Sequence, residues 1–193
     1  MATIILAGGL STRMGRDKAL LAAGNSTLVQ SLVSRFGDKL GPVIVVARHG
    51  QDLILEHAAI VRDIYVGKGP LGGLHAGLSA SPDERNFVLA CDMPYADPNI
   101  ALDLLARLDG HDAVVPRLTQ GLEPLHAVYR KSCLPQIEAN LRADTLRIRD
   151  LLDRIDTLYA TEDELRHLDE DLSSFVNINT PEEYVSFSLQ TKD

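Results

Sequence analysis

Thr3-Ile-Ile-Leu-Ala-Gly-Gly-Leu-Ser-Thr-Arg-Met-Gly-Arg-Asp-Lys18 begins with a short apolar run and continues into a segment rich in glycine and basic residues. The run Thr3–Leu6 is continuously apolar, which is typical of a strand that is buried on both faces of a parallel sheet. Gly8 and Gly9 lack Cβ atoms, so the backbone amides after this strand can converge on an anion. Open α/β sheets bind ligands at the carboxyl ends of their strands. The stretch therefore predicts a phosphate-binding loop at the edge of an α/β sheet.

Hydroxyl groups and positive charges follow the two glycines. The segment holds Ser11 and Thr12 and then three bases within six positions, Arg13, Arg16 and Lys18, in a chain with 19 lysines and arginines. Amides, hydroxyls and cations in one loop favour a polyphosphate ligand over a plain surface turn. The spacing does not match a P-loop, in which four residues separate the first glycine from Gly-Lys-Ser/Thr. A P-loop ATPase or GTPase is therefore excluded at this position.

Short apolar runs alternate with amphipathic segments along the rest of the chain. The predicted strands are Thr3–Leu6, Val43–Ala47, Ala59–Val61, Phe87–Ala90, Ala113–Val115, Ala127–Arg130 and Ile155–Ala160. The predicted helices are Thr27–Leu40, Gly72–Ala80, Pro98–Leu108, Leu134–Ala143 and Leu146–Arg154, and capping boxes open two more at Thr161 and Thr180. The acidic stretch Glu162–Asp171 is expected to be a solvated helix and turn. Strand–helix alternation favours parallel strands with right-handed crossovers, and hence a three-layer, Rossmann-like α/β fold.

Composition and charge exclude several classes of protein. The 193 residues suit one domain, and 45% hydrophobic and 24% charged residues are ordinary globular usage. A net charge of −8 disfavours binding to nucleic acid or to an anionic membrane surface. Two cysteines make neither a disulfide scaffold nor a zinc site. The amino-terminal residues lack the early basic stretch of a signal peptide, so a cytoplasmic protein is expected.

A second glycine motif offers a competing interpretation. Gly67-Lys-Gly-Pro-Leu-Gly72 fits the dinucleotide pattern G-x-G-x-x-G, and Asp92 follows Gly72 by 20 residues, as a ribose-binding acid would. Pro70 removes an amide donor from this loop and is better suited to start a helix. We therefore expect Pro70 to begin a helix that packs closely through its glycines. An NAD-dependent oxidoreductase is kept as an alternative.

Two aspartates follow predicted strands. Asp92, in Leu89-Ala-Cys-Asp-Met-Pro94, projects a carboxylate at the predicted carboxyl edge of the sheet. Mg²⁺ takes one or two carboxylates together with phosphate oxygens, so Asp92 suits a magnesium ligand, and the alternative is a residue that caps a turn. Asp63 is placed to accept hydrogen bonds from a nucleobase or ribose, or to sit in a plain turn. Cys91 is expected to be a buried small residue, because it has no adjacent base.

The segment Phe175–Glu183 predicts a strand that runs into a capped helix. Asn177 and Asn179 are two residues apart and share one face of such a strand. Two amide side chains on one face are costly to bury without partners, so a ligand or a metal is expected beside them. His126, in Glu-Pro-Leu-His126, is expected to be a partly buried structural histidine rather than a catalytic one.

Four motifs together carry a family resemblance. Leu-Ala-Gly-Gly-x-Ser-x-Arg-Met-Gly-x-Asp-Lys at 6–18, Gly-Pro-Leu-Gly-Gly at 69–73, Cys-Asp-Met-Pro at 91–94 and Asn-Ile-Asn-Thr-Pro-Glu at 177–182 occur in this order. With these four motifs in this order, the chain resembles the molybdenum cofactor guanylyltransferases over residues 3 to about 185. The resemblance implies a mostly parallel sheet of the glycosyltransferase-A type. It also implies one nucleotidyltransferase domain over 1–193, with a nucleotide-binding part at about 1–110 and an acceptor-binding part at about 111–185.

The resemblance implies a Mg²⁺-dependent transfer of GMP from GTP to the phosphate of molybdopterin, with release of pyrophosphate. GTP and molybdopterin are then the substrates, and other cofactor-assembly proteins or acceptor molybdoenzymes are the implied protein partners. No nucleic acid and no membrane is implied. The alternatives are cytidylyl or other nucleotidyl transfer to a small phosphorylated acceptor, and a module that binds nucleotide without catalysis.

The resemblance also assigns site residues. The implied nucleotide site consists of Leu6, Ala7, Gly8, Gly9, Lys18, Asp63, Gly69 and Asp92. The implied catalytic residues are Arg13 and Lys18, which neutralise phosphates, and Asp92, which holds Mg²⁺. Asn177, Asn179 and Arg147 are implied on the acceptor side. The chain departs from the family at Val45-Val-Ala-Arg-His49, where many members carry an asparagine that binds the nucleotide. Gly8 favours guanine, because similar cytidylyltransferases have alanine there.

Overall fold

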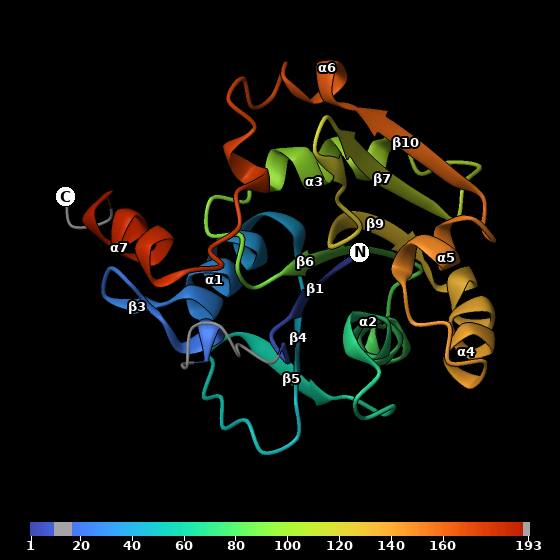
Figure 1. Cartoon of the computed structure of the whole chain (residues 1–193), viewed down its shortest axis with the longest axis horizontal. Coiled ribbons are helices and arrows are strands. Elements are labelled where there is room, and N and C mark those ends of the chain that lie inside the picture. Colours follow the sequence, from blue (N-terminus) through green and yellow to red (C-terminus); the bar gives the residue numbers. More distant parts are fainter. Residues whose placement is uncertain (10–16, 191–193) are drawn as a thin grey trace.

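A central mixed sheet organises the molecule, and the computed structural model describes residues 1–9 and 17–190 (Figure 1). The sheet has eight strands, seven of them in the order β10-β7-β9-β6-β1-β4-β5, with the short β8 paired to β7. The strands are β1 (Ala2–Leu6), β4 (Val43–Ala47), β5 (Ala58–Arg62), β6 (Arg85–Ala90), β7 (Ala113–Leu118), β8 (Gly121–Leu122), β9 (His126–Arg130) and β10 (Thr157–Thr161). A separate two-stranded ribbon joins β2 (Ala22–Ala23) and β3 (Ser26–Thr27). The seven predicted strands before residue 161 are confirmed, with small shifts at their ends.

Most of the sheet is parallel. Strands β5, β4, β1 and β6 run parallel to one another, and β10 runs parallel to β7. Strand β9 is antiparallel to both β6 and β7. The carboxyl ends of β1, β4, β5 and β6 therefore meet at one edge of the sheet. The predicted mostly parallel α/β fold is confirmed.

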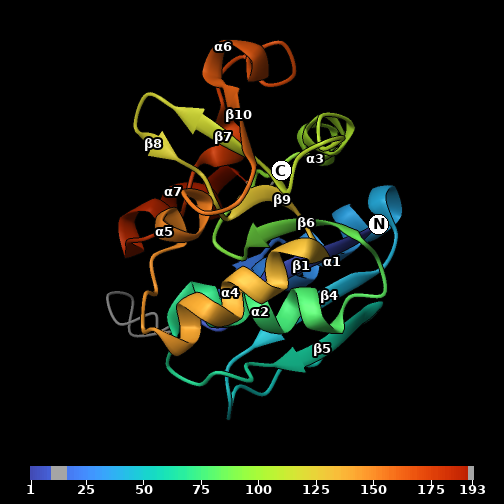
Figure 2. The same cartoon turned by 90° about the vertical axis from the view of Figure 1, so that its right-hand side faces the viewer.

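Helices cover both faces of the sheet (Figures 1 and 2). They are α1 (Leu28–Leu40), α2 (Gly69–Ala80), α3 (Pro98–Ala106), α4 (Leu134–Arg142), α5 (Ile148–Leu152), α6 (Glu162–Leu165) and α7 (Pro181–Gln190). Ile5 of β1 packs in one core cluster with residues of α1 and α3, whereas Ile4 packs in a second cluster with residues of α2, α4 and α5. Adjacent residues of a strand point to opposite faces, so β1 is buried on both sides. The three predicted layers follow from this arrangement. Within the described residues, no helix is long and apolar enough to cross a membrane.

Helix starts follow the capping signals of the sequence. The Thr27 side chain accepts a hydrogen bond from Gln30 N at 3.3 Å, and the Asp97 side chain accepts one from Asn99 N at 2.7 Å, just before Pro98. Such caps satisfy amides that have no partner inside the helix. The expectation that Pro70 begins a helix is confirmed, because α2 starts at Gly69 with Pro70 in its first turn, three residues before the predicted range Gly72–Ala80.

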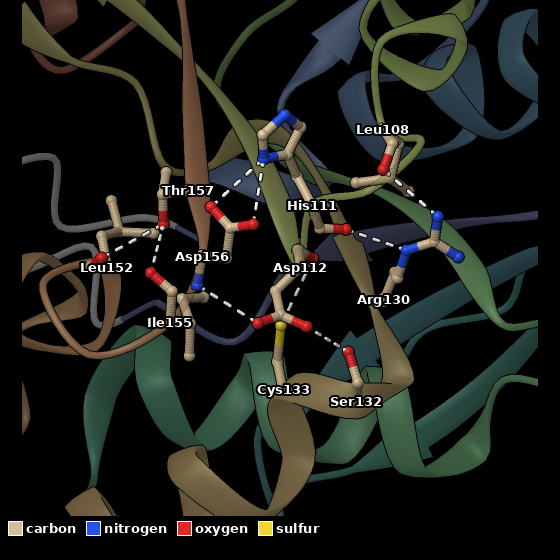
Figure 3. A network of polar contacts seen from close by, with 10 residues as sticks. All are labelled: Leu108, His111, Asp112, Arg130, Ser132, Cys133, Leu152, Ile155, Asp156 and Thr157. Atoms are coloured by element: carbon tan, nitrogen blue, oxygen red, sulfur yellow. Dashed lines mark hydrogen bonds and ion pairs between the residues drawn. The ribbon is translucent and has the colours of Figure 1, made fainter.

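A polar network holds the sheet together at the edge opposite to the carboxyl ends of the parallel strands (Figure 3). Asp112, just before β7, accepts a hydrogen bond from the Ser132 hydroxyl at 2.6 Å and one from Asp156 N at 3.2 Å. The Arg130 guanidinium donates to His111 O at 2.8 Å. These contacts join β7, β9 and β10 near their ends.

One sequence prediction about the carboxyl-terminal segments is wrong. Residues 176–180 form no strand, although the segment that starts at Phe175 was expected to begin with one. Leu172 has a left-handed φ of +54°, and Ile178 N donates a single hydrogen bond to Asp92 O instead of joining a ladder. Hydrophobic periodicity does not report such an individual contact. In Glu162–Asp171 the expected helix and following turn are confirmed, with the helix over Glu162–Leu165.

At Gly77, α2 packs closely against the sheet. A Cβ atom at Gly77 would overlap Ile4 Cγ2 and lie 3.3 Å from Val46 Cγ2. Ile4 is fully buried and β-branched, so it has little freedom to move. We expect Gly77→Ala to lower the free energy of unfolding by about 1–3 kcal/mol, despite a gain of about 1 kcal/mol in helix propensity. Urea unfolding measures this.

Gly37→Ala is the matched control, because the new Cβ would lie 3.6 Å from Val43 Cγ2, an ordinary contact. This variant is expected to keep or gain stability. Equal stability of the two variants would contradict the close approach of α2.

Candidate active site

The glycine-rich loop leaves the sheet at its carboxyl edge. Ala7 N donates a hydrogen bond to Val46 O at 2.8 Å, so the chain follows β4 for one residue beyond β1. Gly8 is half-buried, and a Cβ at this position would lie 3.1 Å from Arg48 N, a tight contact that would require a small shift of the backbone. Gly9 is exposed, and a Cβ there would meet nothing within 4 Å. The backbone of Arg48 thus gives a reason for glycine at position 8 that does not involve a ligand.

Lys18 joins two distant parts of the chain at this edge. Its Nζ donates to Asp92 Oδ2 and to Asn179 Oδ1, both at 2.8 Å. The side chains of Lys18 and Asp92 are 16% and 21% exposed, so the pair is open to a ligand but partly shielded from water. Ile178 N donates to Asp92 O at 2.8 Å and fixes the segment that carries Asn179. The structure therefore brings three predicted residues together: a cation, a carboxylate and an amide.

Asp17 anchors the start of the segment that carries Lys18. Asp17 Oδ2 accepts hydrogen bonds from Gln51 Nε2 at 2.8 Å and from Arg48 Nη2 at 3.1 Å. Gln51 Nε2 also donates to Ala7 O at 3.1 Å, and Gln51 itself is buried. Sequence reasoning missed both Gln51 and Arg48, because no motif or periodicity singles out a polar residue in the loop after β4.

Asp63 lies just beyond β5, at the same edge. Asp63 Oδ1 is buried and has no hydrogen-bond partner among the described residues. Burial raises the pKa of the carboxyl group, and the nearby charge of His49 acts in the opposite direction. A Cβ at Gly73 of α2 would lie 3.7 Å from Asp63 Oδ1, so the carboxylate faces the first turns of this helix. An acceptor without a partner is costly to bury, which favours a donor from a bound ligand.

The structure also describes the predicted residues Asn177, Arg147 and Gly69, which are outside the hydrogen bonds that join Lys18, Asp92 and Asn179. Asn177 is half-buried, and its Nδ2 donates to Phe175 O at 3.4 Å. Arg147 is exposed immediately before α5. Its loop is tied to the start of α2 by the ion pair of Lys68 Nζ and Asp144 Oδ1 at 2.8 Å. Arg13 lies outside the described residues. Gly69, at φ +61°, is exposed where α2 begins.

Glu123 is a further acidic residue at this edge that sequence reasoning passed over. It is half-buried in the turn between β8 and β9. Burial, and then the negative charge of Asp92, raises the pKa of its carboxyl group. The sequence did contain a pointer to this residue, because Glu123 lies three residues before His126 in Glu-Pro-Leu-His. Only the histidine of that motif was considered.

The donor set fits a divalent cation shared with a phosphate ligand. Within residues 1–9 and 17–190, no three histidine, cysteine, aspartate or glutamate side chains gather as a metal site would require on its own. Mg²⁺ needs only one or two carboxylates when phosphate oxygens complete its coordination. Asp92 supplies one such carboxylate at the edge where the glycine-rich loop ends. The residues therefore fit a metal that arrives with its ligand.

His126 and Cys91 are buried, and His126 more deeply than predicted. The His126 side chain is wholly buried, with ring-centroid distances of 5.1 Å to Phe87 and 4.6 Å to Phe175. Neither ring nitrogen has a hydrogen-bond partner among the described residues. Burial lowers its pKa to about 3, and the charge of Asp169 acts in the opposite direction. Burial raises the pKa of the Cys91 thiol, which fits its predicted role as a small buried residue.

His126 gives the fold a pH dependence. The folded protein keeps this ring neutral down to about pH 3, whereas the unfolded chain binds a proton near pH 6.5. Between these values the unfolded state binds more protons, so stability falls as the pH falls. The free energy of unfolding of the wild type should therefore decrease between pH 7.5 and pH 5. In His126→Phe, which lacks the titrating ring, we expect this decrease to be smaller by about 1–2 kcal/mol. Urea unfolding at both pH values measures the difference.

His167→Gln, which changes an exposed histidine, is the control and should keep the pH dependence of the wild type. The same pH dependence in His126→Phe as in the wild type would show that His126 does not titrate as its burial implies.

Comparisons with known proteins agree with this geometry. A family model described as "MobA-like NTP transferase domain" matches residues 3–158. A protein of Pelotomaculum thermopropionicum named "Probable molybdenum cofactor guanylyltransferase" is 36% identical over 98% of this chain and 93% of its own length. A protein of Desulfosudis oleivorans named "Molybdenum cofactor guanylyltransferase" is 34% identical over 93% of this chain and 90% of its own.

Solved structures show the same fold. The crystal structure of molybdopterin-guanine dinucleotide biosynthesis protein A from Archaeoglobus fulgidus superposes with a TM-score of 0.85. It is 26% identical in sequence, and the match covers 98% of each chain.

Proposed function

Because this chain belongs to the MobA-like NTP transferase family, we propose that it is a guanylyltransferase that transfers GMP from GTP to the phosphate of molybdopterin and releases pyrophosphate. The single observation that carries this proposal is the convergence of Lys18, Asp92 and Asn179 where the glycine-rich loop ends. A nucleotidyl transfer needs positive charge beside a triphosphate, a carboxylate for a cation and a polar group toward the acceptor. These three groups supply that set.

The reaction is an in-line attack by an acceptor phosphate oxygen on the α-phosphorus of GTP. The new P–O bond forms as the bond to pyrophosphate breaks, and pyrophosphate leaves with the electron pair. The acceptor phosphate is already ionised near pH 7, so its attack requires no general base. The protein has to hold two anions close together and balance their charge. Lys18 provides one positive charge for this, and Arg13 is proposed to provide another.

Asp92 is proposed to hold Mg²⁺. The bound cation would supply charge neutralisation at the α-phosphate and at the departing pyrophosphate. Lys18 contacts Asp92 directly, so the position of the ammonium group is set by the same carboxylate. Asp92 would therefore position both the cation and the ammonium group of Lys18.

The nucleoside is proposed to lie among Leu6–Gly9, Asp63 and Gly69. The unpartnered Asp63 Oδ1 would accept a hydrogen bond from an N–H group of guanine or a ribose hydroxyl. Arg48 and His49 stand where many family members carry asparagine, so in this chain the base would be recognised without that amide. Gly8 would leave the loop backbone close to the ligand.

The acceptor is proposed to bind toward Asn177, Asn179 and Arg147. In this division, residues of about 1–110 bind the nucleotide and residues of about 111–185 bind molybdopterin, within one domain. Asn179 lies beside Lys18, so the two substrates would meet there. Cofactor-assembly proteins or acceptor molybdoenzymes would receive the product, and the cytoplasm, where GTP is made, is the proposed location.

Calorimetric titration with GTP, CTP, ATP and NAD, each with and without Mg²⁺, tests the nucleotide preference. Selective binding of GTP that Mg²⁺ strengthens, followed by release of pyrophosphate when molybdopterin is added, is the expected result. A preference for CTP would move the chain to cytidylyl transfer. Binding of NAD alone would place the site at Gly67–Gly72 and overturn the proposal.

A further inference from the structure

Gln51 binds three separate parts of the sheet edge with one buried side chain. It lies in the segment after β4 and is 2% exposed. Its Nε2 donates to Ala7 O at 3.1 Å and to Asp17 Oδ2 at 2.8 Å, and its Oε1 accepts a hydrogen bond from Arg48 N at 3.1 Å. A primary amide has two N–H donors, so both donors are used. A buried amide with its donors and its oxygen all bonded is held in one orientation.

Asp17 connects Gln51 to Lys18. Its Oδ2 accepts the bond from Gln51, and its Oδ1 accepts one from Ala19 N at 3.1 Å, which caps the 3₁₀ turn Lys18–Leu20. The side chain of Asp17 is only 13% exposed, so water competes little for these bonds. The position of the carboxylate therefore fixes where the turn starts, and Lys18 is the first residue of that turn.

The bond from Gln51 to Ala7 places Lys18 relative to the centre of the sheet. Ala7 directly follows β1, and β1 stays bonded to the β6 side up to Cys91 N, which donates to the last residue of β1 at 3.1 Å. Asp92 is the next residue. Lys18 is thus held at both ends, because its backbone is tied through Gln51 to the end of β1 and its Nζ is bonded to Asp92 Oδ2.

A lysine side chain does not fix the position of its own charge. Its four-carbon stem is flexible, so the ammonium group could reach Asp92 from many positions of the backbone. A transition state is stabilised by charge that already stands in the right place, and a displacement of about 1 Å can cost about a hundredfold in rate. The buried bonds of Gln51 and Asp17 remove this freedom from the backbone of Lys18.

We propose that Gln51 is a positioning residue for the transfer reaction and acts through Asp17 to hold Lys18 beside the triphosphate. The inference rests on the proposed function, because Lys18 acts in that reaction. Gln51 carries no charge and touches neither substrate. Its effect on the reaction therefore comes only through the position of Lys18.

Steady-state kinetics of Gln51→Met test this role. Methionine is of similar size but cannot donate to Asp17 or Ala7. We expect kcat to fall about tenfold to a hundredfold and KM for GTP to change less than about threefold, because the ammonium charge remains but is displaced in the transition state. Added to Lys18→Met, the same substitution should cause no further loss, since no ammonium group is left to position. A purely structural defect would instead lower the activity of both proteins by the same factor.

Gln30→Met is the matched control. Gln30 also binds the segment between β4 and β5, through Glu56 O at 3.3 Å and Glu56 N at 2.9 Å, so this variant should keep the wild-type kcat. Asp17→Asn tests the same bond if Gln51→Met does not fold. Asparagine has one acceptor oxygen in place of two, so it cannot keep both the bond from Gln51 and the cap on Ala19 N, and kcat should fall at least about tenfold.

Nuclear magnetic resonance gives a readout that does not depend on turnover. The proton–nitrogen correlation signal of the Lys18 ammonium group, identified by its absence in Lys18→Met, should be shifted or lost in Gln51→Met and unchanged in Gln30→Met. Thermal unfolding of each variant verifies that the fold is retained.

Two results would overturn the proposal: a wild-type kcat with an unchanged Lys18 signal in folded Gln51→Met, or the same fractional loss in the Lys18→Met background as in the wild type. In either case guanylyl transfer by the wild type would leave the proposed function standing. Absence of transfer by the wild type, with a Lys18 signal that depends on Gln51, would instead refute the function and keep the positioning of Lys18.

Discussion

The Asp92→Ala protein is expected to fold normally and to lose nearly all turnover. The carboxylate of Asp92 contacts Lys18 and is proposed to hold the metal. Asp92 lies just after β6, and its backbone oxygen accepts a hydrogen bond from Ile178 N. The backbone bond survives the substitution, so the segment that carries Asn179 stays in place. We expect kcat to fall by at least about a hundredfold to a thousandfold, because charge stabilisation in the transition state is lost. Release of pyrophosphate from GTP and molybdopterin measures it.

The expected effect on stability is small. A partly exposed ion pair contributes about 0–1 kcal/mol, so the melting temperature should change by no more than a few degrees. Asp109→Ala is the control, because Asp109 Oδ1 pairs with Arg85 at 2.7 Å at the far edge of the sheet. Turnover that stays dependent on Mg²⁺ in Asp92→Ala would refute the assignment of this residue.

Lys18→Met is expected to produce the second large loss of activity. Methionine keeps much of the length of the side chain but removes the ammonium group that donates to Asp92 and Asn179. The site would then have one positive charge fewer to offset the repulsion between the triphosphate and the carboxylate of Asp92. We expect kcat/KM for GTP to fall about a hundredfold or more. Initial rates measured over a range of GTP concentrations separate the effect on KM from that on kcat.

Lys131→Met is the matched control. Lys131 Nζ donates to Ser81 O at 2.7 Å, far from the glycine-rich loop, so its loss should leave kcat/KM unchanged. The double variant of Lys18→Met and Asp92→Ala should be hardly worse than either single variant, because the two groups act as a unit. Strictly additive losses would indicate that Lys18 and Asp92 act independently.

The fold was largely predictable because its core strands are short, continuous apolar runs. Val43–Ala47 was predicted to the residue, since each of its positions is buried between two helical layers. The carboxyl-terminal segment was not predictable in the same way. Val176–Thr180 is joined to distant parts of the chain by the bond from Ile178 N to Asp92 O and by the bond from Lys18 Nζ to Asn179 Oδ1. Contacts between residues so far apart in sequence produce no hydrophobic periodicity.

The candidate site was predictable in part. Lys18, Asp92 and Asn179 were chosen separately and prove to be in contact. Their meeting depends on strand order, which places β1 beside β6, and on the return of the chain after α6. Gln51 was missed because its significance comes from its contacts with Ala7 O and Asp17 Oδ2, which do not follow from the residues adjacent to it in sequence.

The bond between Ile178 and Asp92 has a consequence for synthesis on the ribosome. The first 110 residues include the four parallel strands, the glycine-rich loop and Asp92, so a nascent chain can build that half of the sheet early. Asn179 is synthesised long after this half, and until then Lys18 lacks the acceptor that Asn179 Oδ1 provides. A chain stopped before residue 178 would contain Lys18 and Asp92 without the bond from Ile178 N to Asp92 O. The contacts around Lys18 are therefore completed only after the segment that carries Ile178 and Asn179 has been made.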